Sequence, residues 1–168
     1  FANFIAITAM KKPSQPERLF TEGLSLTCSN DYVNAMILND AGQALVFERP
    51  RSGRSGVQWR LLNQQLNQQE EPFTAVQNAL LQNTGYQTTH WSYLGSHAID
   101  PHQPQGTVYF FCAQKAQPVA DPQPSNGRWP GVARWVPLSD VRYALLDGRI
   151  SIISHALTVS LAFLTTLK

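Results

Sequence analysis

The side chains that could do chemistry gather between Trp59 and Tyr86. Two adjacent acids, Glu70 and Glu71, precede a proline there, and the residues around them are mostly Gln, Asn and apolar. Mg²⁺ requires hard oxygen ligands and gains most of its affinity from carboxylates, which amides cannot replace. This stretch therefore offers polar groups that could hold a ligand, but few of the charged groups that metal-dependent catalysis requires.

Basic and aromatic side chains elsewhere could contact a ligand. Arg49, Arg51 and Arg54 lie in the sequence RPRSGRSG, whose glycines, serines and proline indicate an exposed loop. Guanidinium groups bind phosphate well, so this loop is either a solvated segment or a phosphate-binding one. Tyr93 and Trp129 could stack on a flat ring of a ligand. The alternative is packing, of Trp129 within a loop and of Tyr93 in the core.

The elements that must position these groups follow from the apolar pattern and the turn residues. Tyr32–Leu38 and Ala44–Glu48 are typical of two strands joined by a hairpin turn at Asn39–Gln43. The remaining apolar runs predict strands at 57–62, 90–96, 107–113 and 133–136, loops at 100–106 and 117–131, and short elements at 4–9 and 19–27.

Three helices are expected. The best marked begins at Pro72, with Glu71 at its positive end, and stops at Gly85, which suits a left-handed cap. Three apolar residues should pack inward from it: Phe73, Val76 and Leu80. No charged residue occurs from position 72 to 99, so the outer face is either covered or unusually neutral. A second helix is expected at about 137–146. The third, at about 151–167, is apolar on several sides and must be deeply packed or lie at a subunit interface.

Length and composition exclude several classes of protein. A chain of 168 residues suits one domain, 1–168, with an N-terminal extension (1–31) and a core (32–168). The net charge of +2 from 13 basic and 11 acidic residues argues against nucleic-acid binding. No segment suits a membrane span or a secretory signal, so a cytoplasmic protein is expected. Cys28 and Cys112 each lie in or beside an apolar run and are interpreted as buried thiols rather than a disulfide.

From Val33 to Lys168 the order of elements resembles the Nudix superfamily, and most closely its ADP-ribose and nucleotide-sugar pyrophosphatase branch. The family signature is G-x5-E-x7-R-E-U-x-E-E-x-G-U, where U is a bulky apolar residue. Gly85 and Tyr86 match its final G-U, Leu80 matches the first U, Glu70 matches the first glutamate, and Gln64 stands at the opening glycine. The resemblance implies an α+β fold, an α/β/α sandwich in which helices flank a mixed sheet.

The signature is degenerate, because its charged positions are neutral here. Asn78 and Ala79 replace the R-E pair, and Gln82 and Asn83 replace the E-E pair. In the family these glutamates hold the divalent cations that activate water, and the arginine pairs with the first glutamate. Glu70 is thus the only motif acid retained, no catalytic residue is assigned, and no metal or other cofactor is expected.

The resemblance leaves three functional readings. The preferred one is a protein without metal-dependent catalysis that serves as a ligand-binding or regulatory module for a nucleotide or nucleotide sugar. The second is an active Nudix hydrolase that uses Mg²⁺ at a non-standard site. The third is a structural homodimer with a vestigial pocket, because members of this branch commonly dimerise and the deficit of charge fits a covered surface.

Overall fold

A computed structural model of the chain describes residues 30–53, 55–100, 103–123 and 131–167. The elements in order are β1 (Tyr32–Asn39), β2 (Ala44–Pro50), β3 (Val57–Arg60), β4 (Leu62–Gln65), α1 (Pro72–Thr84), β5 (Tyr86–Gln87), β6 (His90–Asp100), β7 (Gln103–Pro118), β8 (Val132–Val136), α2 (Leu138–Leu146) and α3 (Ile153–Thr165). The expected elements at 4–9 and 19–27, together with Cys28, Arg54 and Trp129, lie outside the described residues.

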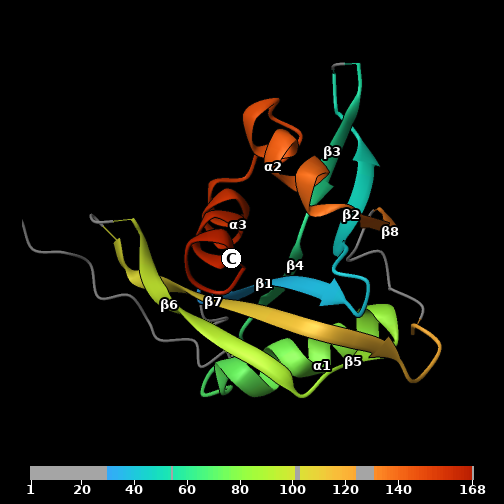
Figure 1. Ribbon diagram of the computed structural model, residues 1–168. Coiled ribbons are helices and arrows are strands. Elements are labelled where there is room, and N and C mark those ends of the chain that lie inside the picture. Colours follow the sequence, from blue (N-terminus) through green and yellow to red (C-terminus); the bar gives the residue numbers. More distant parts are fainter. Residues whose placement is uncertain (1–29, 54, 101–102, 124–130, 168) are drawn as a thin grey trace, which may run out of the picture.

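The strands form one mixed sheet of eight strands with the order β3-β2-β1-β7-β5, to which β4, β6 and β8 are added by pairing with β1, β7 and β2. β1 and β7 are parallel, whereas the other pairs are antiparallel. In Figure 1, α1 lies on one side of the β1–β7 region and α3 on the other, with α2 beyond α3. The expected α+β fold, a mixed sheet flanked by helices, is confirmed.

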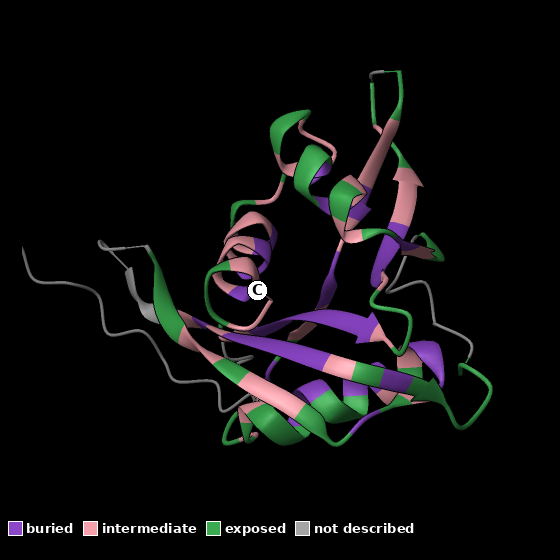
Figure 2. Cartoon of the chain, in the orientation of Figure 1, coloured by how far each residue is buried: buried purple, intermediate pink, exposed green. Residues whose placement is uncertain are grey.

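Successive side chains of the central strands point to opposite faces of the sheet, so each face has its own apolar cluster. Ile37 and Phe111 contribute to the cluster beneath α1, while their neighbours Met36 and Cys112 contribute to the cluster beneath α2 and α3. Figure 2 shows the buried residues concentrated in β1, the middle of β7 and the inner sides of the helices. Burial also raises the pKa of the Cys112 thiol to about 12, so this cysteine is a buried, protonated thiol as expected.

The ends of α1 are those that the sequence predicts. The carboxylate of Glu71 accepts hydrogen bonds from the backbone N–H groups of Phe73 and Thr74, which lower its pKa. Gly85 closes the helix with φ of 71°, a left-handed conformation that favours glycine. Val76 is buried as expected, but Phe73 is 38% exposed and lies against the rings of Trp91 and Phe111 at the edge of the core.

Two segments expected to be loops are strands. The Gln/Asn-rich stretch before α1 contains β4, because Leu62 and Leu66 are anchored in the core and residues 62–65 pair with β1. Within the proline-rich stretch, Asp100 ends β6 and residues 103–106 begin β7, which pairs antiparallel with β6. Pro104 is tolerated there because β7 has only β6 beside it until pairing with β1 begins at Val108. The expected loop at 117–131 likewise begins later, since β7 continues to Pro118.

The last helix is packed along one side only. Val159 and Ala162 are fully buried, whereas Ile153 is 85% exposed and Leu164 is 78% exposed. The expectation of a deeply packed helix therefore holds for its inner side alone. No helix in the described ranges is long and apolar enough to cross a membrane.

Candidate functional site

The signature positions on α1 do not form a site for a metal ion. Ala79 is 3% exposed and belongs to the core cluster, while Asn78 and Gln82 are exposed and Asn83 is half-buried. The segment after β7 is tied to this end of the helix, since Gln123 N–H donates to the Gln82 carbonyl at 2.9 Å. The N–H groups of Val119 and Ala120 donate to the Gly85 carbonyl in the same way. The C-terminal end of α1 is thus covered by its own chain.

Glu70, the retained motif acid, has a structural partner. One carboxylate oxygen accepts hydrogen bonds from the backbone N–H and the side-chain amide of Asn67, each at 2.9 Å. Asn67 thereby does what the resemblance assigns to the missing arginine, which is to hold the loop before the helix. The described residues contain no group of three or more His, Cys, Asp or Glu side chains placed to hold a metal ion. The Mg²⁺ that the resemblance implies does not fit these positions.

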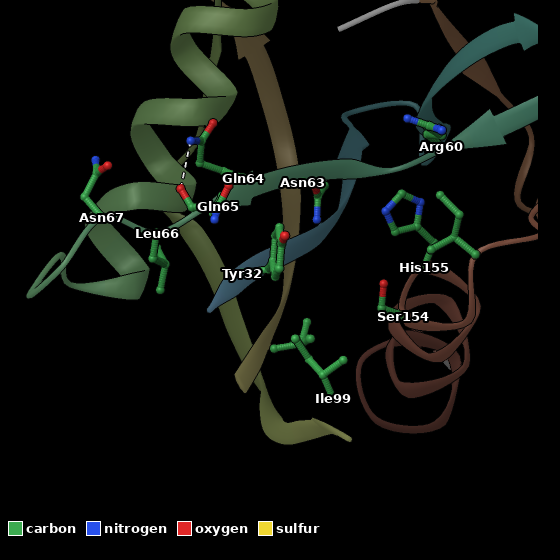
Figure 3. A pocket seen from close by; sticks show the side chains of 12 residues that line it. Tyr32, Arg60, Asn63, Gln64, Gln65, Leu66, Asn67, Ile99, Ser154 and His155 are labelled. Carbon is green, nitrogen blue, oxygen red and sulfur yellow. Dashed lines mark hydrogen bonds between the residues drawn. The ribbon is translucent and has the colours of Figure 1, made fainter. Parts of the chain in front are cut away.

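A pocket of about 660 Å³ opens between β4, the loop after it, and the start of α3 (Figure 3). Figure 3 shows Arg60, Ser154 and His155 together at one end, and Gln64, Gln65 and Asn67 at the other. The complete lining is Tyr32, Arg60, Asn63, Gln64, Gln65, Leu66, Asn67, Ile99, Val108, Ile152, Ser154 and His155. None of these described residues is acidic, so the pocket presents neutral polar groups and one permanent cation.

Strand pairing explains the polar floor of the pocket. Asn63 of β4 stands opposite Asn34 of β1, and its amide N–H donates to the Asn34 side-chain oxygen. Asn34 is fully buried, and its own amide nitrogen has no hydrogen-bond partner in the described part of the chain. A buried amide donor without a partner costs free energy, so a hydrogen-bond acceptor close to this position would be stabilising.

Arg60 is half-buried at the end of β3. Burial, and the nearby charge of Arg49, lower its pKa. The Nε atom of Arg60 is buried and lacks a hydrogen-bond partner among the residues described. Ion pairs in the described ranges join Arg134 to Glu48 and Arg149 to Asp147, and neither involves Arg60. The guanidinium is therefore a cation at the pocket wall that no acid among the described residues pairs with.

His155 is 3% exposed and is held in one tautomer. Its Nδ1 accepts a hydrogen bond from the backbone N–H of Leu61 at 3.2 Å, so the neutral ring carries its proton on Nε2. Burial, and after it the charge of Arg60, lower the pKa of His155 to about 4. At neutral pH the ring is thus an uncharged hydrogen-bond donor beside a cation.

The beginning of α3 adds backbone donors to this end of the pocket. Ile152 caps the helix without a side-chain hydrogen bond, and the first turn contains no acidic residue. The first N–H groups of a helix have no partner within it and carry a partial positive charge. Ile152, Ser154 and His155 from this turn all line the pocket.

The residues that the sequence suggested as ligand contacts are dispersed. Arg51 donates to the Gly148 carbonyl in the loop between α2 and α3, and Arg49 does not line the pocket although its charge acts on Arg60. Tyr93, 59% exposed, lies elsewhere, in an aromatic groove on the α1 side. Besides Tyr93, that groove of about 460 Å³ is lined by Glu71, Pro72, Phe73, Trp91, Tyr109 and Phe111.

Sequence reasoning did not single out Arg60 or His155 as pocket residues. Arg60 stood out only as a member of the cluster of arginines at 49–60. His155 had one available signal, because it is the single ionisable residue of α3, which is otherwise made of apolar residues, serine and threonine. Their proximity depends on how α3 packs beside β3 and β4, and no spacing in the sequence reports it.

Solved structures of similar fold carry related descriptions. A crystal structure of an ADP compounds hydrolase has a TM-score of 0.65 and 14% identity, over 79% of this chain and 70% of that chain. A NUDIX hydrolase from Nitrosomonas europaea has a TM-score of 0.56 and 16% identity, over 81% and 89%. The NUDIX domain of Shewanella oneidensis NrtR, solved in complex with ADP ribose, has a TM-score of 0.58 and 16% identity, over 82% and 88%.

Identities this low show a shared fold and nothing finer. No curated protein sequence matches the chain. The sequence itself, however, matches the family model of the NUDIX domain over residues 29–155, from just before β1 to the first turn of α3. Since that match spans more than half of the chain, and the strands and helices have the arrangement expected from the resemblance, the protein belongs to the Nudix family.

Proposed function

We propose that the protein binds a nucleotide-type ligand in the pocket beside α3 and does not hydrolyse it by a metal-dependent reaction. The observation that carries the proposal is the contrast in side chains. The positions where the family places its metal ligands hold Ala79, Gln82 and Asn83, while a polar pocket without carboxylates lies beside α3. A module of this kind would report or store a ligand rather than consume it.

The size and lining of the pocket suit such a ligand. A volume of about 660 Å³ lies in the range of small-molecule sites. Tyr32, Ile99 and Val108 supply apolar surface for a base or sugar ring, and the side-chain amides of Asn63 and Gln65 can hydrogen-bond its polar edges. ADP ribose is the first ligand to test, because the Shewanella oneidensis domain of similar fold was solved with it.

A thermal unfolding series tests binding. ADP ribose and a nucleotide sugar should raise the midpoint of unfolding in buffer containing EDTA, with a rise that grows with ligand concentration. A ligand at 100 times its Kd stabilises the folded state by about 2.7 kcal/mol. Tyr32→Ala should reduce the rise for both ligands, whereas Tyr143→Ala, at an exposed position on α2, serves as the control. If no nucleotide changes the midpoint, the binding proposal is wrong.

The hydrolase alternative predicts a different product. Incubation with Mg²⁺ and ADP ribose would then release a nucleoside monophosphate, and Glu70→Gln would abolish the release. We expect no product above the rate without protein, because the carboxylate of Glu70 is engaged by Asn67 and the other motif acids are absent. Turnover that depends on both Mg²⁺ and Glu70 would replace the binding proposal with an enzymatic one.

The homodimer alternative is favoured by the outer side of α3. Ile153 and Leu164 project from it with 85% and 78% of their surface exposed, and Leu146 at the end of α2 is 87% exposed. Exposed large apolar residues are common singly, but two on one helix suit a contact between subunits. Light scattering should compare the molar mass of wild type with that of Leu164→Lys. A dimeric wild type and a monomeric variant would support this interface, whereas a monomeric wild type would exclude it.

A further inference from the structure

The arginine at the pocket wall needs a counter-charge that the described chain does not supply. Arg60 has a buried Nε without a partner, and a second cation, Arg49, lies close enough to lower its pKa. An unpaired charge at a partly buried position is costly unless a group of opposite charge compensates it. With no acid in the lining, that group is most simply part of a bound ligand.

Donors that suit an anion converge beside Arg60. The Nε2–H of His155 has no partner among the described residues, since the ring's one hydrogen bond is made by Nδ1. The Ser154 side chain and the uncapped first turn of α3 adjoin it. Figure 3 shows Arg60, Ser154 and His155 from two separate elements gathered at one end of the pocket. Arginine, imidazole N–H and a helix N-terminus are all groups that bind oxyanions.

We propose that Arg60 and the Nε2–H of His155 bind a phosphate group of the ligand directly, without a divalent cation between protein and phosphate. This inference rests on the proposed function and adds the orientation of the ligand. The phosphate lies at the α3 end, and the base or sugar extends past Tyr32 toward Asn63 and Gln64. Arg60 takes over the neutralisation of phosphate charge that a metal ion provides in hydrolysing members of the family, but it supplies no metal-bound water for hydrolysis.

A divalent cation would be unstable at this end of the pocket. Arg60 and Arg49 would repel it, and His155 offers its N–H rather than a lone pair, because Nδ1 is occupied by the Leu61 N–H. The neutral state of His155 also avoids a second full charge next to Arg60 in the ligand-free protein. The arrangement thus favours an anion and disfavours the metal ion that usually accompanies it.

Isothermal titration calorimetry in EDTA tests the inference with three probes: ADP ribose, adenosine and inorganic pyrophosphate. Wild type should bind ADP ribose and pyrophosphate, and the two should compete. Arg60→Gln should weaken both by about 10- to 100-fold, as expected for loss of a charge-assisted hydrogen bond. Adenosine, which has no phosphate, should bind equally to wild type and variant.

Two further variants control for structure and charge. His155→Asn keeps an acceptor near the Leu61 N–H but removes the donor that faces the pocket, and should weaken pyrophosphate binding by roughly 3- to 10-fold. Arg134→Gln removes the same charge from an exposed position on β8 and should leave binding unchanged. Unfolding of ligand-free Arg60→Gln should occur at or above the wild-type midpoint, because an unpaired charge has been removed.

The outcomes separate this inference from the proposed function. If ADP ribose binds in EDTA with an affinity that Arg60→Gln does not change, the phosphate site is wrong and nucleotide binding stands. If pyrophosphate binds through Arg60 but ADP ribose does not bind, the phosphate site stands and the nucleotide proposal is wrong. If wild type binds neither ADP ribose nor pyrophosphate, the phosphate site and the nucleotide proposal are both wrong. That result comes from wild type alone, so it does not depend on whether a variant folds.

Discussion

The C-terminal half of α1 and the pocket beside α3 are built around opposite faces of the sheet and have opposite character. On α1, the family's metal-ligand positions carry a methyl group and amides, and the chain after β7 is hydrogen-bonded across the helix end. At the pocket, Arg60 has a buried Nε without a hydrogen-bond partner among the described residues, and the Nε2–H of His155 has no partner among them either. One region lacks the carboxylates that the family signature places there, whereas the other presents hydrogen-bond donors and a cation that suit an anion.

This difference teaches that formation of helix α1 and the presence of metal ligands on it are separate requirements. Glu71 caps the start of α1, Leu80 packs it into the core and Gly85 ends it. None of these roles depends on a metal ligand. The helix therefore remains intact when the glutamates between these positions are replaced. The residues proposed to hydrogen-bond the ligand lie on β3, β4 and α3, and none of them is a signature position of α1.

Restoring an acid on α1 gives the largest expected effect. Ala79→Glu would place a carboxylate in the core beside Val76 and Leu80, so we expect a loss of about 3–5 kcal/mol in the free energy of unfolding. Asn78→Glu, one residue earlier at an exposed position, should change it by less than about 0.5 kcal/mol. Urea unfolding measures both. A stable Ala79→Glu variant that gains affinity for Mg²⁺ would show that this face still opens to a metal site.

Acid should weaken the pocket region through His155. Its pKa is about 4 in the folded protein against 6.5 for an unperturbed imidazole, so only the unfolded chain takes up this proton between those values. Stability from this residue is therefore complete above pH 6.5 and is lost as the pH falls toward 4, by up to roughly 3 kcal/mol.

Unfolding curves between pH 7 and 4.5 measure this loss, with His155→Asn as the control. The variant should show a flatter dependence of stability on pH over this range. Identical slopes for wild type and variant would mean that His155 is not held neutral by burial and by Arg60.

A pair of glycine substitutions tests whether the segment after β7 packs tightly against the end of α1. Gly85 and Gly42 have φ of 71° and 70°, so alanine suffers the same left-handed strain at both positions. At Gly85 the new Cβ would also lie 1.9 Å from the Ala120 carbonyl oxygen, whereas at Gly42 nothing lies within 4 Å. Gly85→Ala should therefore cost about 1–3 kcal/mol more than Gly42→Ala in urea unfolding. Equal costs would show that the segment after β7 is free to move away.

Much of the fold could be predicted because its signals are local. The β1–β2 hairpin, the proline start and glycine stop of α1, and the strand before α2 each depend on residues adjacent in sequence. The predictions were wrong where the secondary structure depends on a neighbouring strand. Residues 62–65 and 103–106 carry amides, prolines and glycine that suit loops, and they become strands because β1 and β6 lie beside them.

The candidate site was less predictable for the same reason. The sequence shows that the motif positions are neutral, since the register follows from Gly85, Leu80 and Glu70. It does not show that Arg60 meets His155, which is 95 positions later in the chain and is brought near by the packing of α3. Hydrogen bonding of Glu70 to Asn67 was also hidden, because an amide replaces a charged partner at a different spacing.

The affinity for ADP ribose with and without Mg²⁺ tests the central claim most directly. Calorimetric titrations of wild type in EDTA and in Mg²⁺ should give the same Kd, and the nucleotide recovered afterwards should be intact ADP ribose. Both results are expected if Arg60 and neighbouring donors replace the metal ion. Binding that appears only with Mg²⁺, or recovery of a nucleoside monophosphate, would contradict the account of a ligand-binding protein without metal-dependent catalysis.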